Sequence, residues 1–142
     1  MLNLEWQYFF WSLKTMKGLI WFRSDLRIDD NPALMHASRA CDELIGIYIL
    51  SKSQWSLHNE SNVKLEFLHN NLIQLEQSLQ KLNIPLLLIE TKNYESLPID
   101  LASFAKLNSV GHIFWNNEFG VNEGKRDLTV NNLLKDNGIN SA

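Results

Sequence analysis

The chain has 142 residues, of which 45% are apolar and 20% charged, with a net charge of −3. This length and composition fit one globular domain with its own core. Nucleic-acid affinity rests mainly on Lys and Arg that neutralise phosphates, so the acidic balance argues against a stand-alone DNA-binding domain. The single cysteine, Cys41, excludes an internal disulfide and agrees with a cytoplasmic location. No apolar run reaches the ~20 residues that a membrane span needs.

The first residues, MLNLEWQYFFWSLKT, are rich in aromatic side chains. They lack a basic leading region and a small-residue cleavage site, so a signal peptide is not expected. We interpret residues 1–16 as a leader in which Met16 is the functional start. The alternative is a packed or partner-binding terminal helix.

From Lys17 onward, short apolar runs alternate with helical patterns. The run Leu19–Phe22 predicts a first strand, and Leu44–Leu50 predicts a second. Runs that are nearly continuous in apolar character are typical of central parallel strands, which are covered on both faces. Between them, Asp30-Asn31-Pro32 supplies a capping side chain and then a proline, which predicts a helix start.

A regular leucine stripe predicts the second helix. The stripe consists of Leu65, Leu68, Leu72, Leu75, Leu79 and Leu82. Spacings of three and four residues place these side chains on one helix face. A coiled coil is the alternative. An apolar strand, Leu86–Ile89, follows at once, which favours packing on a sheet.

The last third of the chain repeats the alternation. We predict a third helix over about Leu97–Leu107, a fourth strand at His112–Trp115 and a fourth helix over about Val121–Asp136, which Gly138 ends. This order predicts an α/β fold with a parallel sheet and helices on both faces. Because the sequence stops at Ala142, we expect a fifth strand to be missing and the fourth strand to form an unprotected edge.

Common catalytic patterns are missing from the sequence. It has no G-x-G-x-x-G, no phosphate-binding glycine loop and no metal-ligand spacing among its four histidines. We therefore expect no catalytic residue and no metal site. A polar cluster does follow the first strand, where ligands bind in open α/β sheets. It consists of Arg23, Asp25, Arg27, Asp29, Asp30 and Asn31. The alternative is structural: Arg and Asp pair with one another, hold the turn and cap the helix.

Three segments carry a resemblance to a known family. LIWFRSDLRIDDNPAL (Leu19–Leu34) resembles the opening signature of the DNA photolyase and cryptochrome family. YILSKSQWSLHN (Tyr48–Asn59) and FWNNEFGVNEGKRDLTV (Phe114–Val130) extend the match. The likeness is greatest to bacterial class I cyclobutane pyrimidine dimer photolyases of the folate type.

The resemblance implies a Rossmann-like domain with strand order 3-2-1-4-5, here 3-2-1-4 without the fifth strand, over residues 17–142. In the family a helical domain follows, which holds FAD; we expect it to be absent from this chain. A methenyltetrahydrofolate antenna lies between the two domains and passes excitation energy to FAD, which splits the pyrimidine dimer. The resemblance thus implies the antenna domain of a deoxyribodipyrimidine photo-lyase. This domain would be inactive alone, and its partner would be the helical domain. It would contact damaged DNA only through that domain and would not contact a membrane.

Residue by residue, the resemblance assigns antenna contacts to His58, Asn122 and Glu123. A carboxylate such as Glu123 can accept the exocyclic amine and ring N–H of a pterin together. Each residue has a plainer alternative: a solvated histidine, a helix cap and a first-turn acid, respectively. Arg126 and Asp127 match the Arg-Asp pair of the family, which we interpret as an ion pair on the helix surface.

Relatives differ from this chain at Gly124, where they usually carry a charged residue. Relatives also close the antenna groove with their helical domain, so we expect weak pigment binding here. Three other functions stay open. They are a cryptochrome-like photoreceptor, which this domain does not distinguish from a photolyase, a small nucleotide-binding α/β protein and a partner-binding module.

Overall fold

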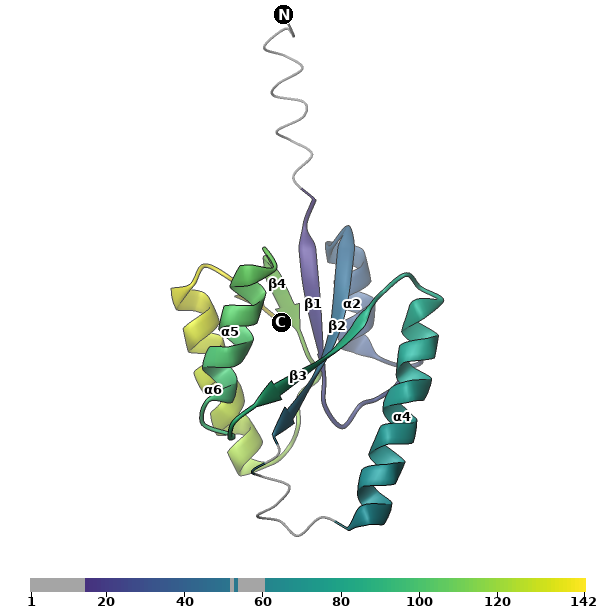
Figure 1. The fold of residues 1–142 in the computed structure, drawn as a ribbon. Helices are drawn as coiled ribbons and strands as arrows, with labels where there is room; N and C mark the ends of the chain where they lie inside the picture. Colours follow the sequence, from purple (N-terminus) through teal and green to yellow (C-terminus); the bar gives the residue numbers. More distant parts are fainter. Residues whose placement is uncertain (1–14, 52, 54–60) are drawn as a thin grey trace, which may run out of the picture.

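A computed structural model describes residues 15–51, 53 and 61–142 of the chain. Within these residues, five parallel strands form one sheet in the order β3-β2-β1-β4-β5. The strands are β1 (Lys17–Phe22), β2 (Glu43–Ser51), β3 (Leu86–Thr91), β4 (His112–Phe114) and β5 (Asn140–Ser141). The helices are α2 (Pro32–Ala40), α4 (Asn62–Gln80), α5 (Leu97–Leu107) and α6 (Val121–Asp136). Helices α2 and α4 cover one face of the sheet, and α5 and α6 cover the other (Figure 1).

The helix boundaries follow local signals in the sequence. The Asn31 side chain accepts a hydrogen bond from the Leu34 amide at 3.1 Å, and Pro32 opens α2 as predicted. Ser61 caps α4 through a bond from the Lys64 amide at 3.3 Å. Gly138, at φ +71°, follows the end of α6 in the left-handed conformation that favours glycine, as predicted.

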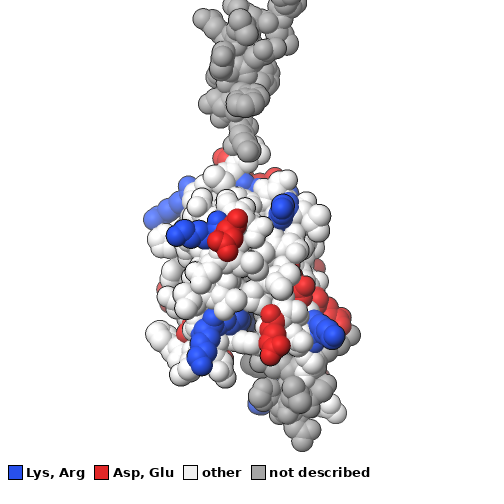
Figure 2. All heavy atoms as spheres, turned by 90° about the vertical axis from the view of Figure 1, so that its left-hand side faces the viewer, with Lys and Arg blue, Asp and Glu red and all other residues white. Residues whose placement is uncertain are grey.

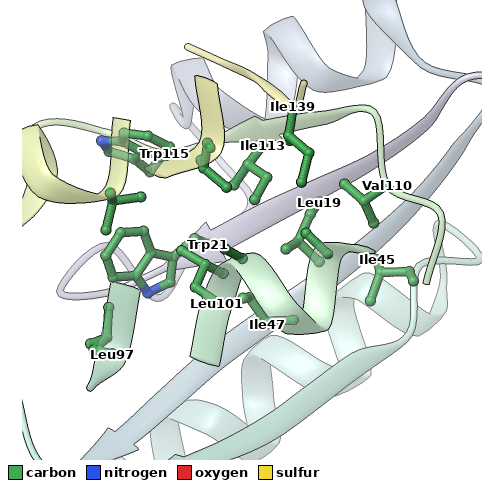
Figure 3. Close-up of a cluster of buried hydrophobic side chains, with 14 residues drawn as sticks. Leu19, Trp21, Ile45, Ile47, Leu97, Leu101, Val110, Ile113, Trp115 and Ile139 are labelled. Atoms are coloured by element: carbon green, nitrogen blue, oxygen red, sulfur yellow. The ribbon is translucent and has the colours of Figure 1, made fainter. Parts of the chain in front are cut away.

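Apolar side chains form a separate core on each face of the sheet. The core under α5 and α6 contains the fully buried Leu19, Leu101, Ile113 and Leu134 (Figure 3). The core under α2 and α4 is built around Phe22 of β1. Burying large apolar side chains on both faces is the main stabilising contribution to this fold.

Two expectations about the edges of the sheet are wrong. A fifth strand is present, because the main chain of Asn140 and Ala142 bonds to Gly111 and Ile113 at 3.0 Å each. The fourth strand is therefore not an edge. At the other side, β3 is an edge strand, as the predicted order 3-2-1-4 implies, with Leu87 40% and Leu88 57% exposed.

The leucine stripe of α4 is only partly buried. Leu72, Leu75 and Leu79 pack into the core as predicted, because they lie in the second half of the helix. Leu82 lies beyond the end of α4 and is 50% exposed. The stripe thus packs on the sheet, as favoured over a coiled coil, but over fewer turns than expected.

Candidate functional site

The parallel strands β1 and β4 end side by side, and the polar residues that follow them meet there. Arg23 follows β1 directly, while Asn116 and Glu118 lie in the segment that joins β4 to α6. Ligands of open α/β sheets bind at this edge, beyond the carboxyl ends of the strands. The candidate site is therefore formed by the β1 exit, the β4–α6 segment and the first turns of α6.

Arg23 connects β1 to α6 through a buried ion pair. Its side chain is 5% exposed, and Nη1 donates to the Asp127 carboxylate at 2.6 Å. Nη2 donates to the main-chain oxygen of Asn116, and Glu118 lies 3.6 Å from Nε. Arg126 also contacts the Asp127 carboxylate, at 3.0 Å. Arg126 and Asp127 thus pair as predicted. The prediction that this pair lies on the helix surface is wrong, because both side chains are largely buried. The shortest contact of the Asp127 carboxylate is with Arg23.

Asp25 and Asn116 join the first motif of the resemblance to the third. The Asn116 amide donates to Asp25 at 2.6 Å and to the Asn31 side chain at 2.8 Å, while its oxygen accepts from the Ala33 amide at 3.0 Å. Asp25 also accepts from the Arg23 main-chain amide at 2.9 Å. The first-strand cluster thus caps the helix and holds the turn, but the ion pair of Arg23 is made with α6 rather than within the cluster.

The Arg27 side chain bonds the turn before α2, whereas Arg23 bonds α6. Its guanidinium donates to the main-chain oxygens of Asp29 and Asp30 at 3.2 and 3.3 Å. Asp30 adopts φ 48°, a conformation that is uncommon outside glycine. Arg27 therefore supports this turn.

Charge and hydrogen bonding fix the ionisation of Glu118 and Arg126. Burial raises the pKa of Glu118, but hydrogen bonds from Arg126 and Ser24 and the charge of Arg23 outweigh it, so its pKa falls below the ordinary value. Burial lowers the pKa of Arg126, but its bond to Glu118 at 2.9 Å and the nearby Asp127 raise it, giving a net rise. Both groups are charged at neutral pH.

A groove beside α6 contains two of the predicted pigment contacts. We call it the α6 groove; it encloses about 830 Å³. Its lining residues are Ser53, Asn93, Tyr94, Glu95, Pro98, Asn122, Glu123, Lys125, Arg126 and Thr129. Asn122 is exposed and Glu123 half-buried. His58, the third predicted contact, lies outside the described residues.

The first turn of α6 differs from the predicted capping. Gly120 is the N-cap, without a side-chain cap bond, and Asn122 lies inside the helix, so its interpretation as a cap is wrong. The Glu123 carboxylate folds back over Gly120, where it occupies the space that a Cβ would fill. Gly124 is inside the helix, and no described atom outside its own helical turn lies within 4 Å of where a Cβ would stand.

Sequence reasoning missed Tyr94 and Glu118. Tyr94 lines the α6 groove and donates from its hydroxyl to the Asn122 main-chain oxygen at 3.0 Å. The signal that could have found Tyr94 is its place just after β3, at the same edge of the sheet as the other site residues. Glu118 sits in a matched segment but gives no spacing signal, because its partners Arg23 and Arg126 come from other elements.

The outer face of α5 and α6 carries charges of both signs. Figure 2 shows Lys and Arg side chains among Asp and Glu side chains over this face, without a continuous basic surface among the described residues. A phosphate backbone would need such a surface. Across the described ranges, we find no group of His, Cys, Asp and Glu that could hold a metal ion. Nor is any helix in these ranges both long and apolar enough to span a bilayer.

Comparison with known proteins identifies the family. The family model for DNA photolyase matches residues 18–142. The deoxyribodipyrimidine photo-lyase of Buchnera aphidicola from Acyrthosiphon pisum is 37% identical over 124 residues, which are 87% of this chain and 26% of that protein. The Escherichia coli enzyme of the same name is 36% identical over 118 residues, or 82% and 25% of the two chains.

Solved structures agree with these relatives. A class III photolyase from Agrobacterium tumefaciens superposes with a TM-score of 0.69 at 26% identity, covering 91% of this chain and 25% of that one. An archaeal photolyase from Sulfolobus tokodaii gives 0.74 at 24% identity, with coverage of 89% and 28%, and shows the fold alone. The chain spans about a quarter of the length of the curated relatives it matches. It belongs to the DNA photolyase family, and it corresponds to the amino-terminal α/β domain of that family.

Proposed function

We propose that this chain is the antenna-binding part of a light-driven DNA photolyase, and that its pigment is methenyltetrahydrofolate. The observation that carries the proposal is the position of Glu123, a carboxylate in the first turn of α6 that lines the α6 groove. A pterin presents an amine and a ring N–H side by side, and a carboxylate can accept both as charge-assisted bonds. When bound, the folate would absorb near-UV light and pass the energy to FAD held by the rest of the photolyase.

The groove and its polar groups fit such a ligand. Pockets for small molecules enclose ~300–1,000 Å³, a range that includes the α6 groove at about 830 Å³. Asn122 offers an amide that both donates and accepts, and His58 belongs to the proposed contact set through the family resemblance. We propose that Glu123 binds the polar edge of the pterin, while Asn122 and His58 orient the ring.

The remaining parts of the proposal concern the whole protein. Residues 17–142 are the antenna domain and residues 1–16 an upstream extension, in a cytoplasmic protein. The partner is a helical FAD-binding domain, and damaged DNA is bound through that domain, in keeping with the mixed charges of the α5–α6 face. Reading the genomic sequence downstream of codon 142 for a flavin-domain frame tests this arrangement.

A cryptochrome-type photoreceptor is the second candidate. Cryptochrome-1 of Arabidopsis thaliana is 31% identical over 122 residues, which are 86% of this chain and 17% of that protein. The pigment also has a rival, because the Sulfolobus tokodaii photolyase is described with two FAD molecules and a novel light-harvesting cofactor. A repair assay on the whole protein distinguishes the two functions, and parallel titrations with folate and FAD distinguish the pigments.

The direct test is a titration of the 142-residue chain with methenyltetrahydrofolate, followed by near-UV absorbance and fluorescence. Glu123→Gln keeps the size of the side chain but replaces one carboxylate oxygen with an NH₂ group. This group donates hydrogen bonds and would face an N–H donor of the pterin. Loss of one charge-assisted bond of about 1.5–3 kcal/mol predicts an affinity at least about tenfold weaker. Glu76→Gln, an exposed change on α4, is the control and should bind as the wild type does. Equal affinity of the Glu123 variant and the wild type would refute the role of Glu123.

A further inference from the structure

Tyr94, in the turn between β3 and α5, stands between two adjoining cavities. Its half-buried side chain lines the α6 groove and also a second cavity of about 570 Å³, which we call the strand-end hollow. The hollow lies at the carboxyl ends of β1 and β2 and includes Trp21, Tyr48 and Ser51. Apart from Tyr94, only Glu123 and Arg126 line both cavities among the described residues. The ring of Tyr94 therefore forms part of the wall beside the proposed pterin-binding carboxylate.

A polar network holds the Tyr94 turn in place. The buried Thr91 hydroxyl donates to the Asp100 carboxylate at 2.5 Å and lies 2.8 Å from the Ser96 hydroxyl. The Asn93 side chain accepts from the Ser96 amide at 2.8 Å. These bonds fix the residues on both sides of Tyr94, so a ligand that packs on its ring meets a wall that is already ordered. Preorganisation of this kind lowers the entropic cost of binding.

The polar and aromatic parts of Tyr94 are engaged differently. Its hydroxyl donates to the Asn122 main-chain oxygen at 3.0 Å, which ties the turn to the first turn of α6. The Arg126 guanidinium lies 5.6 Å from the ring centroid, where a cation and an aromatic ring attract each other. Because the hydroxyl proton is already donated to Asn122, the ring is the part of Tyr94 that offers a flat surface to a ligand in the groove.

We propose that Tyr94 is a pigment-binding residue whose ring packs against the flat heteroaromatic ring that Glu123 holds by its polar edge. The inference rests on the proposed function and adds a residue to its site. Stacking of a flat heterocycle on an aromatic side chain contributes free energy whatever the hydrogen bonds at its edge. Tyr94 thus supplies affinity and fixes the plane of the pigment, while Glu123 fixes its edge.

The test compares two variants of Tyr94 in the same folate titration of the 142-residue chain. Tyr94→Phe keeps the ring but loses the bond to Asn122, whereas Tyr94→Leu loses both. We expect the Phe variant to bind within about twofold of the wild type and the Leu variant about tenfold more weakly, the size of one lost aromatic stack. The fluorescence yield and absorption maximum of the bound pigment should change only in the Leu variant. Tyr48→Leu, which alters the strand-end hollow alone, is the matched control and should leave affinity unchanged.

Thermal unfolding of the same variants separates binding from folding, because a variant that stays folded well above the titration temperature cannot owe weaker binding to unfolding. Two results would overturn the inference while the proposed function stands: a Leu variant that binds with wild-type affinity and spectrum, or a Phe variant as impaired as the Leu variant. If the wild type itself binds no folate, the proposed function fails and the inference fails with it. Weak binding by the Leu variant alone supports the inference.

Discussion

Asp127 is the position where one lost charge should cost the most stability. The change Asp127→Asn keeps the shape of the side chain but removes the negative charge that faces Arg23 at 2.6 Å. Because the Arg23 side chain is only 5% exposed, water cannot easily replace the lost carboxylate. Among the described residues, Nε of Arg23 already lacks a hydrogen-bond partner, so the guanidinium has no spare bond to offset the loss. Breaking a buried ion pair by removing one partner costs about 3–5 kcal/mol. Because Glu118 still lies 3.6 Å from the guanidinium, we expect the lower end, about 3 kcal/mol.

Urea unfolding followed by circular dichroism measures this loss. The transition midpoint should fall with little change in its slope, because both proteins expose the same surface on unfolding. For a chain of this length, about 3 kcal/mol corresponds to a fall in melting temperature of about 6–12 °C. The control is Glu43→Gln, which breaks the pair between Glu43 and Lys17 at 3.5 Å. The Glu43 side chain is 60% exposed, so its loss should cost less than about 1 kcal/mol.

Salt separates the two ion pairs further. Exposed pairs are screened by added salt, whereas buried pairs are screened much less. The difference between wild type and Asp127→Asn should therefore persist at high salt, while any effect of Glu43→Gln should shrink. If Asp127→Asn unfolds at the same urea concentration as Glu43→Gln, the buried network does not stabilise the fold.

Three further changes have expected outcomes. Gly124→Ala should raise the free energy of unfolding by about 0.5–1 kcal/mol, measured by urea, because the site is helical and the added methyl group meets no described neighbour within 4 Å. Gly120→Ala should displace the Glu123 carboxylate, which occupies the space of the new Cβ, and so weaken folate binding in titration without removing the acid. Burial lowers the pKa of His112, so as the pH falls through about 6.5 the unfolded chain binds the proton first and stability declines. In His112→Gln, the unfolding free energy should therefore depend less on pH as the pH falls through about 6.5.

Much of the fold could be predicted because its signals are local. Asn31 and Pro32 are adjacent in the sequence, and a capping side chain followed by proline is enough to predict the start of α2. The apolar runs of β1 and β2 are likewise readable, since burial on both faces requires apolar side chains at successive positions. The alternation of such runs with helices is enough to indicate a parallel α/β sheet.

The edges of the sheet could not be predicted in the same way. Strand β5 is only Asn140–Ser141, two polar residues whose pairing depends on main-chain bonds to β4 rather than on an apolar pattern. Strand β3 has the same apolar character as a central strand, although Leu88 is more than half exposed. Apolar runs indicate that a strand forms, but its place in the sheet depends on partners far away in the sequence.

Residues of the candidate site could be predicted where the family resemblance supplied them. Residues that only the tertiary fold brings to the site could not be predicted. Asn122 and Glu123, which the resemblance assigned as pigment contacts, both line the α6 groove, and their role as pigment contacts remains a prediction. Tyr94 reaches the same groove from another element, the β3–α5 turn. No spacing in the sequence connects Tyr94 to Glu123, because the fold alone brings the two elements together.

The residues that mark the family here are chiefly those that join distant parts of the domain. Arg23 belongs to the opening motif and Asp127 to the last, 104 positions apart, yet they form one buried ion pair. Asn116 similarly binds Asp25 and Asn31 across more than 80 positions. Because burying a charge without its partner is costly, each motif requires the other for the β1 exit to pack against α6. The motifs therefore specify how the β1 exit and α6 are assembled, whereas Tyr94, which lies outside the three motifs, lines the groove that we propose binds the pigment.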